Sequence, residues 1–242
     1  MLPAKPTTTY VLLFGIAAIG TSFTLAGASR VEEDGKALEA ARQRSAKNLQ
    51  ELMIAMWNYH DINDHLPPAA VYDKAGKSLL SWRVLLLPYL DQDDLFAQFH
   101  LDEPWDSAHN KPLLAKMPKQ YEPPLPGETK EKYATFYQVF VGKGALFEGK
   151  EGMCVSDITD GTSNTIGIIE AAQRVPWTKP VDLLYDAKKP LPNLGGLFDD
   201  GITAAFADGS AHWLKKDFDD ATMRVAITRN GAEILDTNKL EK

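Results

Sequence analysis

The longest periodic pattern of the chain predicts one amphipathic helix from Val31 to about Asp61. Apolar and small residues recur there at intervals of three and four, which places them on one face of a helix. This stripe is made of Leu38, Ala41, Ser45, Leu49, Leu52, Met56 and Tyr59. The acidic residues 32–34 are expected in the first turn, where negative charge suits the helix dipole. Pro67 and Pro68 end the pattern, because proline cannot continue the hydrogen-bond ladder.

The two halves of this predicted helix differ in character. The first half is rich in alanine and only weakly apolar. We therefore expect it to lie in solvent or to pack on sister subunits. Residues 49–60 are apolar on more than one side, so we expect this half to be buried.

After the long helix the elements become short, and the pattern predicts an antiparallel sheet with small helices. Short helices are expected at 81–90, 91–99 and 219–227. Strands are expected at 135–142 and 166–171, and a hairpin at 202–206 and 210–214. Asp208-Gly209 lies between the last two runs and matches a two-residue hairpin turn. A long helix followed by a small antiparallel sheet, short helices and long loops is an α+β fold.

An uncharged run from Tyr10 to Ala28 precedes the helix and predicts the compartment. It follows a weakly positive start with Lys5, and it ends in small residues before Ser29, as a secretory signal does. It is also nearly long enough to span a bilayer as an anchor. Both interpretations stay open, and both place the rest of the chain outside the cytoplasm. We thus expect a signal or anchor at 1–28, a long helix at 29–66 and a globular domain at 67–242.

Composition narrows the classes of function. The chain carries 26 basic and 33 acidic residues and has no dense run of lysine and arginine, so we expect no nucleic-acid partner. A single cysteine, Cys154, rules out an intrachain disulfide. There is no phosphate-binding glycine loop, zinc-protease motif, paired CxxC or nucleophile elbow. We expect no enzymatic activity and no cofactor, with calcium as the one open alternative.

The candidate calcium loop is the segment SDITDGTSNT. Asp157, Asp160 and Asn164 offer the several oxygens that calcium favours on a flexible loop. The alternating acidic spacing of an EF-hand loop is missing. The same side chains also suit bonds to backbone groups within a turn. Calcium binding and turn architecture both remain open.

Further candidate binding residues are spread along the chain. His60 and Asp61 form the densest polar cluster, which predicts either a ligand site or an ordinary helix end. Trp105 is one of several tryptophans that fit either a glycan-binding cleft or the core. Asp208 adds acid near the hairpin, where a solvated surface is the alternative.

Six blocks of sequence resemble the bacterial envelope family labelled domain of unknown function 1559, which also carries a solute-binding-protein family 10 label. The blocks are KNLQELMIAMWNYHDINDHLPPAA, SWRVLLLPYLDQDDLFAQFHLDEPWDSAHN, YQVFVG, ITDGTSNTIGIIEAA, VPWTKPVDLLYD and FADGSAHWLKK. Many members carry a prepilin-type N-terminus. The resemblance implies a pseudopilin-like protein of the periplasm or cell surface.

Two departures from the family pattern stand out. The Phe-Thr-Leu-Ile-Glu sequence of prepilins has no counterpart before the apolar run, since Phe23-Thr24-Leu25 lies at its far end and is followed by Ala26. The position of a histidine found in many relatives is Phe198 here. Our hypothesis is a non-catalytic exported subunit. Its N-terminal segment contacts the membrane, and its long helix binds another copy or an envelope protein. The alternative is an extracellular module that binds a solute or a glycan.

Overall fold

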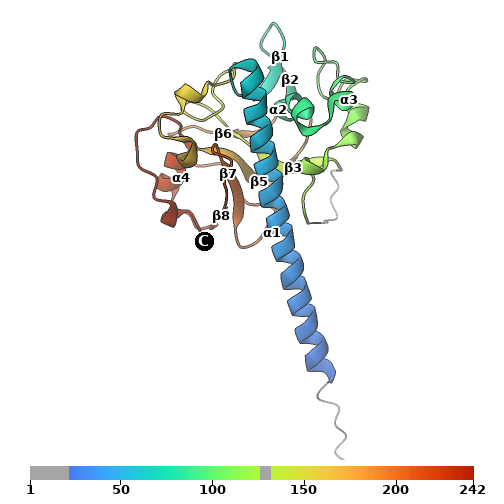
Figure 1. Ribbon diagram of the computed structural model, residues 1–242, viewed down its shortest axis with the longest axis vertical. Coiled ribbons are helices and arrows are strands. Elements are labelled where there is room, and N and C mark those ends of the chain that lie inside the picture. Colours follow the sequence, from blue (N-terminus) through green and yellow to red (C-terminus); the bar gives the residue numbers. More distant parts are fainter. Residues whose placement is uncertain (1–21, 126–131) are drawn as a thin grey trace, which may run out of the picture. The chain divides into compact units, whose positions relative to one another are not determined.

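The computed structural model describes residues 22–125 and 132–242 (Figure 1). Its contacts divide the chain after Glu39 into two units, of which the first is described from Ser22 and the second runs from Ala40 to Lys242. Helix α1 (Ser22–Asn63) contributes to both units. The remaining elements belong to the second unit, which combines small sheets with short helices and loops. The predicted α+β fold with a long N-terminal helix is confirmed.

Helix α1 is longer than the sequence pattern indicated. It begins at Ser22, nine residues before Val31, and it ends at Asn63 close to the predicted end. The acidic residues 32–34 therefore do not lie in its first turn, and that prediction is wrong. They lie further along the helix, where they are exposed. Asp64 takes a left-handed conformation with a φ of 64° directly after the helix, which turns the chain away.

The second part of α1 is buried as predicted. Leu49, Leu52, Met53 and Met56 are fully enclosed, and the stripe extends back to Ala41 and Ser45. Ile54 and Ile62 are exceptions, with 56% and 75% of the residue exposed. Spacing of three and four thus found the buried face of this half.

The central sheet has four antiparallel strands in the order β3-β5-β7-β8. The strands are β3 (Ala134–Gln138), β5 (Ile166–Pro176), β7 (Ile202–Phe206) and β8 (Ala211–Leu214). The predicted hairpin is present, and β5 runs further than expected. The run predicted as one strand at 135–142 is divided into β3 and β4 (Phe140–Val141), which belong to different sheets. Irregular register in the pairs β3–β5 and β5–β7 marks bulges.

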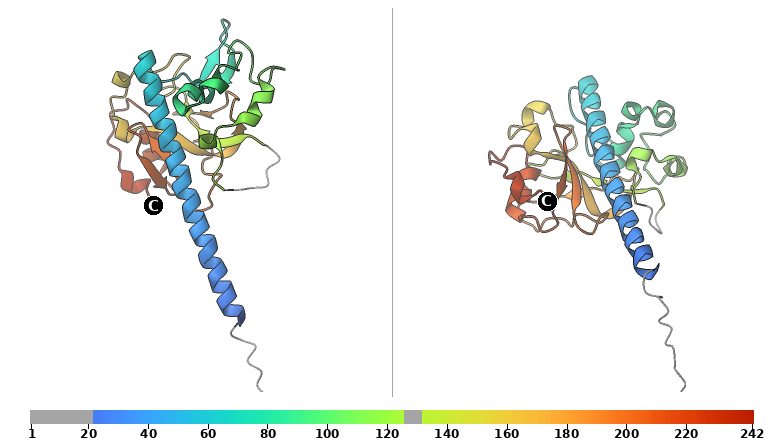
Figure 2. Two further views of the ribbon diagram at one scale, coloured as in Figure 1. Left: turned by 45° about the vertical axis from the view of Figure 1, so that its right-hand side comes forward. Right: turned by 60° about the horizontal axis from the view of Figure 1, so that its bottom comes forward.

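Both faces of this sheet are covered. Successive side chains of a strand point to opposite faces, and the side chains on each face belong to a different hydrophobic cluster. Ile168 and Ala205 belong to a core cluster shared with Leu49 and Met53 of α1. On the other face, strand residues belong to a second cluster with helix α4 (Asp220–Ile227); they include Ile166, Ile169, Ala204 and Phe206. The sheet is therefore a middle layer between α1 and α4 (Figure 2).

The turn of the β7–β8 hairpin differs from the predicted two-residue type. Ala205 pairs with Ala211, and the amide of Phe206 donates to Ser210 O at 2.9 Å, so the loop contains residues 207–209. Only Gly209 has a positive φ, 88°, whereas a two-residue type I′ turn needs two such residues. The loop is a three-residue connection closed by a left-handed glycine.

Two small sheets and several short helices complete the second unit. Strands β1 (Ala70–Tyr72) and β2 (Ser78–Ser81) form an antiparallel hairpin, and β4 (Phe140–Val141) pairs in parallel with β6 (Leu183–Leu184). The helices include α2 (Trp82–Leu85), a 3-10 turn at Leu87–Leu90 and α3 (Asp93–Phe96). The sequence pattern had not indicated β1, β2 or β6.

Within the described residues, no helix has the length and apolar character needed to cross a bilayer. Most of the predicted signal or anchor at 1–28 lies outside the described residues, which begin within it at Ser22.

Candidate functional site

The polar side chains of the predicted calcium loop form hydrogen bonds with backbone groups. The carboxylate of Asp160 accepts hydrogen bonds from the amides of Gly231 at 2.6 Å and Ala232 at 2.9 Å. Asp157 accepts from the amide of Cys154 at 3.0 Å, and Asn164 donates to Asp160 O at 2.7 Å. In the part of the chain that the structure describes, no three His, Cys, Asp or Glu residues are grouped to hold a metal. Calcium binding here stays a prediction.

His60 and Asp61 lie in the last turn of α1. The His60 Nδ1 atom is 3.6 Å from Asp61 Oδ1, and its ring lies edge-on to Trp57 with centroids 5.3 Å apart. Asp61 is exposed and borders a shallow pocket of about 450 Å³. The other residues of this pocket are Asn58, Ile62, Pro88, Tyr89 and Asp91.

The other two candidate binding residues have separate surroundings. Lys179 lies over the Trp105 ring at 5.4 Å, and the Trp105 amide donates to Leu79 O at 2.8 Å. Asp208 is in the hairpin loop. Among hydrogen bonds, ion pairs and ring contacts of the described residues, only the His60–Asp61 pair links two of the four. The structure therefore does not gather them into one site.

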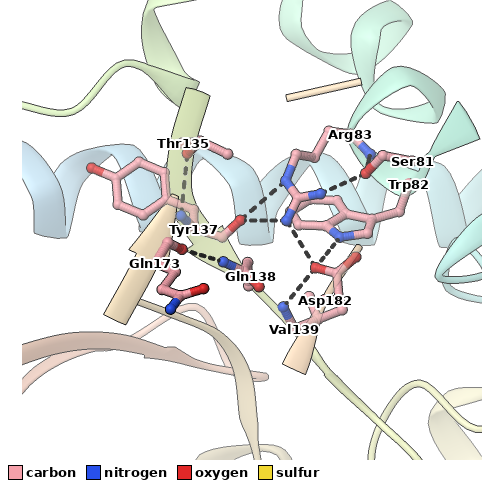
Figure 3. Close-up of polar contacts among 9 residues, drawn as sticks. All are labelled: Ser81, Trp82, Arg83, Thr135, Tyr137, Gln138, Val139, Gln173 and Asp182. Atoms are coloured by element: carbon pink, nitrogen blue, oxygen red, sulfur yellow. Dashed lines mark hydrogen bonds and ion pairs between the residues drawn. The ribbon is translucent and has the colours of Figure 1, made fainter. Parts of the chain in front are cut away.

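Arg83 is a fully buried charged residue in the second unit, two positions after the capping residue Ser81 (Figure 3). Its guanidinium donates to Tyr137 O of β3 through Nε at 3.0 Å and through a terminal nitrogen at 2.7 Å. It also donates to Ser81 Oγ at 2.6 Å and to Asp182 Oδ1 at 2.8 Å. One side chain thereby joins β2, β3 and the segment before β6.

Asp182 is the buried counter-ion of Arg83. Its Oδ1 atom also accepts hydrogen bonds from the Trp82 indole and the Val139 amide, both at 3.1 Å (Figure 3). Burial raises the pKa of this carboxyl, while the Arg83 charge and the hydrogen bonds oppose the rise. Because all three nitrogens of the guanidinium donate to protein acceptors and the side chain is fully buried, this arrangement holds the fold together.

A second buried polar group links α1 to the sheet. Glu170 of β5 accepts hydrogen bonds from the Ser45 hydroxyl and, at 2.8 Å, from the Thr203 amide of β7. The Tyr137 hydroxyl is 3.0 Å from Ser45 Oγ and accepts from Asn48 at 3.3 Å. Burial raises the pKa of Glu170 to about 7, against the opposing effect of the Ser45 and Thr203 bonds. Burial also raises the pKa of Tyr137.

The β7–β8 hairpin brings a serine, a histidine and two carboxylates together. Ser210 Oγ donates to Asp208 Oδ1 at 2.6 Å and is 2.8 Å from His212 Nε2. His212 Nδ1 is 2.6 Å from Glu241 Oε1. His212 thereby links the β7–β8 hairpin to Glu241.

A larger pocket, of about 740 Å³, lies between the loop after β4 and the loop after β6. It is lined by Lys143, Gly144, Tyr185, Asp186, Ala187 and Lys188. The parallel pairing of β4 with β6 explains the position, because both strands leave the sheet at the same end. The Tyr185 amide extends the pairing through a bond to Val141 O at 2.9 Å. Ligand sites in proteins commonly have volumes of roughly 300–1,000 Å³.

None of the residues that form the buried networks or line this larger pocket was predicted from the sequence. For the networks a signal was present, because Arg83 and Glu170 are single charges within the apolar runs SWRVLLL and IGIIEAA. A charge in a buried run needs a partner, so such positions indicate an internal network. The pocket residues carry no such signal, since they come from two loops far apart in the sequence.

Residues 35–137 match the model of a family described as "Protein of unknown function (DUF1559)". No curated protein and no solved structure matches the chain. The matched segment contains most of α1, the Ser81–Arg83 turn and strand β3, which supply many of the contacts described above. The family resemblance drawn from the sequence is confirmed by this match over residues 35–137.

Proposed function

We propose that this chain is a non-catalytic, exported, pseudopilin-like subunit of the cell envelope that assembles through the first part of α1. The observation that carries the proposal is the exposure of this part of the helix. Of residues 32–40, all except Leu38 are exposed. From Ala41 onward one side of the same helix is buried.

The exposed part of α1 lacks the tertiary packing that normally stabilises a helix. A short helix is only marginally stable in water, and most helices in proteins are held by tertiary packing. The Glu32–Lys36 ion pair, at 2.8 Å, is exposed and contributes little. Ala37 and Ala40 lie three residues apart on one face and are small enough to let a second helix approach closely. Contact with another copy, or with an envelope protein, supplies the missing packing.

Export is the second element of the proposal. It is supported by the uncharged run Tyr10–Ala28 and by the implied envelope location of the family. The expected location is the periplasm or cell surface, with the N-terminal segment in or near the inner membrane. Fractionation of the native protein and its intact mass test this element. A start at Ser29 indicates secretion and a full-length chain in the membrane fraction indicates anchoring, whereas a soluble cytosolic protein that retains Met1 contradicts export.

Assembly is tested with two deletions that differ only in the exposed helix. Removal of residues 1–28 keeps the exposed helix, and removal of residues 1–39 deletes it. Neither deletion reaches Ala41 or Ser45, which are buried. Light scattering after size-exclusion chromatography is expected to find oligomers of the first variant and monomers of the second. Circular dichroism should show both folded, and oligomers that survive the longer deletion would sink the assembly proposal.

A second candidate function is favoured by the larger pocket. An extracellular module that binds a solute or a glycan needs a concave site of this size, and the residues of the two loops form one. The two functions are compatible, because assembly uses residues before Ala41 and the pocket uses residues 143–188.

A further inference from the structure

The loops that form the larger pocket are held in place from outside it. Arg224 of α4 donates to the carbonyl oxygens of Asp186 and Ala187, both at 3.4 Å, and to Lys189 O at 2.7 Å. These bonds fix the loop after β6 in one conformation. A site that is already ordered loses little conformational entropy when a ligand binds.

The opposite wall is fixed by a second arginine. Glu148 accepts hydrogen bonds from the Gly144 amide at 3.0 Å and from Arg229 at 2.8 Å, and Arg229 also donates to Ala145 O at 2.7 Å. The carboxylate of Glu148 is therefore already committed to this turn. These bonds lower the pKa of Glu148 below the usual glutamate range, so it stays ionised near neutral pH.

The charges that line the pocket are mostly positive. Lys143 and Lys188 are both exposed and line the pocket. The one acid of the lining, Asp186, accepts a hydrogen bond from the Lys188 amide at 2.9 Å and pairs with the Lys189 ammonium group at 3.5 Å. The Asp186 carboxylate thus interacts with groups of its own loop. A positive pocket on a chain of net charge -7 differs from the rest of the surface.

We propose that this pocket binds a small anionic solute whose carboxylate lies between Lys143 and Lys188. This inference rests on the second candidate function and names its ligand class. An ammonium group binds a carboxylate more strongly than it binds a neutral hydroxyl, because a hydrogen bond between charged groups is about twice as strong.

The test measures binding of oligogalacturonate to the full chain by isothermal titration calorimetry. Neutral oligogalactose and inorganic phosphate are compared under the same conditions. The variant replaces both lysines, Lys143→Gln and Lys188→Gln. The control replaces Lys74 and Lys119, exposed lysines that do not line the pocket, and it changes the net charge equally. Loss of each charged contact is expected to weaken binding about tenfold or more.

The expected result is binding of oligogalacturonate that weakens with salt, survives in the control and is lost in the pocket variant. Stronger binding of phosphate than of oligogalacturonate, lost in the same variant, would overturn the carboxylate as the group that the lysines bind. Binding that is equal for neutral and acidic sugars, or unchanged in the pocket variant, would overturn the site. No binding of any probe would do the same. Light scattering on the pocket variant keeps the outcomes distinct, because assembly through α1 does not involve these lysines.

Discussion

At the scale of single residues, the buried charges show how this chain connects segments that are distant in sequence. Arg83 contacts Ser81, Tyr137 and Asp182, and Glu170 contacts Ser45 and Thr203. Burying an ion is costly unless a partner of opposite charge and several hydrogen bonds replace water. Because these partners come from different elements, each charge is tolerated only when those elements are in place. The two networks therefore specify the arrangement of the second unit.

Replacing Asp182 by Asn is expected to destabilise the protein strongly. The substitution leaves the Arg83 charge buried without its counter-ion, which costs about 3–5 kcal/mol in comparable cases. Urea denaturation followed by circular dichroism measures the free energy of unfolding. The matched control is Glu51→Gln, which removes an exposed ion pair with Lys47 at 3.6 Å and should change stability by less than about 0.5 kcal/mol. Equal effects of the two substitutions would contradict the role given to Asp182.

Glu170 is expected to make stability fall as the pH rises from about 4.5 to about 7. The pKa of this carboxyl is raised to about 7 in the folded protein, from a value of 4.5 in the unfolded chain. The folded state therefore binds the proton more tightly, and its advantage is lost as the pH passes the folded pKa. The size of the effect is about 3 kcal/mol.

The variant Glu170→Gln isolates this contribution, because a neutral amide keeps the shape and has no proton to lose. Urea denaturation at pH 5 and pH 8 should show that the wild type loses more stability than the variant between the two values. A difference between wild type and variant that is the same at both pH values would contradict a raised pKa.

The sequence predicted which positions are buried or form polar loops, but it did not predict which residues they contact. The sequence indicates that Asp157, Asp160 and Asn164 lie in a polar loop. The backbone amides that donate to Asp160 belong to Gly231 and Ala232, which lie far along the chain. The interaction of Ser45 with Glu170 has the same property. Periodicity reports which face of an element is buried, whereas contacts between distant segments depend on how the elements pack.

At the scale of elements, the predictions succeeded where a pattern was long. The stripe of α1, the strand runs and helix α4 were all found from hydrophobic periodicity. Strands β1 and β6 have three and two residues and carry too few positions for a period to register. The hairpin turn was placed correctly but given the wrong type, because Asp-Gly is compatible with both two-residue and three-residue loops.

The crossing of α1 over β5 is expected to tolerate no added methyl group. A Cβ at Gly167 would overlap the sulfur of Met53, which is fully buried. Gly167→Ala should therefore destabilise the protein by about 1–3 kcal/mol through overpacking. The control Gly35→Ala adds the same methyl group on α1 where no atom lies within 4 Å, and it should leave the unfolding midpoint of the second unit unchanged. Urea denaturation of both variants measures the free energy of unfolding. An unchanged value for Gly167→Ala would contradict the predicted clash.

At the scale of the whole molecule, the α+β fold class followed from the order of long and short patterns. The division after Glu39 could not be read in the same way, because a helical pattern continues through it. What separates the two units is burial, which depends on strands that follow much later. The proposed assembly surface and the proposed pocket lie on opposite sides of this boundary in the sequence.

The sheet order β3-β5-β7-β8 has a consequence for the biogenesis of the protein. Met53 and Leu49 are synthesised early, whereas Ile168 and Ala205, which share their cluster, emerge late from the ribosome. Contacts between such distant positions form slowly, since a long stretch of chain must be ordered first. The helix face consequently stays uncovered until those strands are synthesised, which fits the export that we propose.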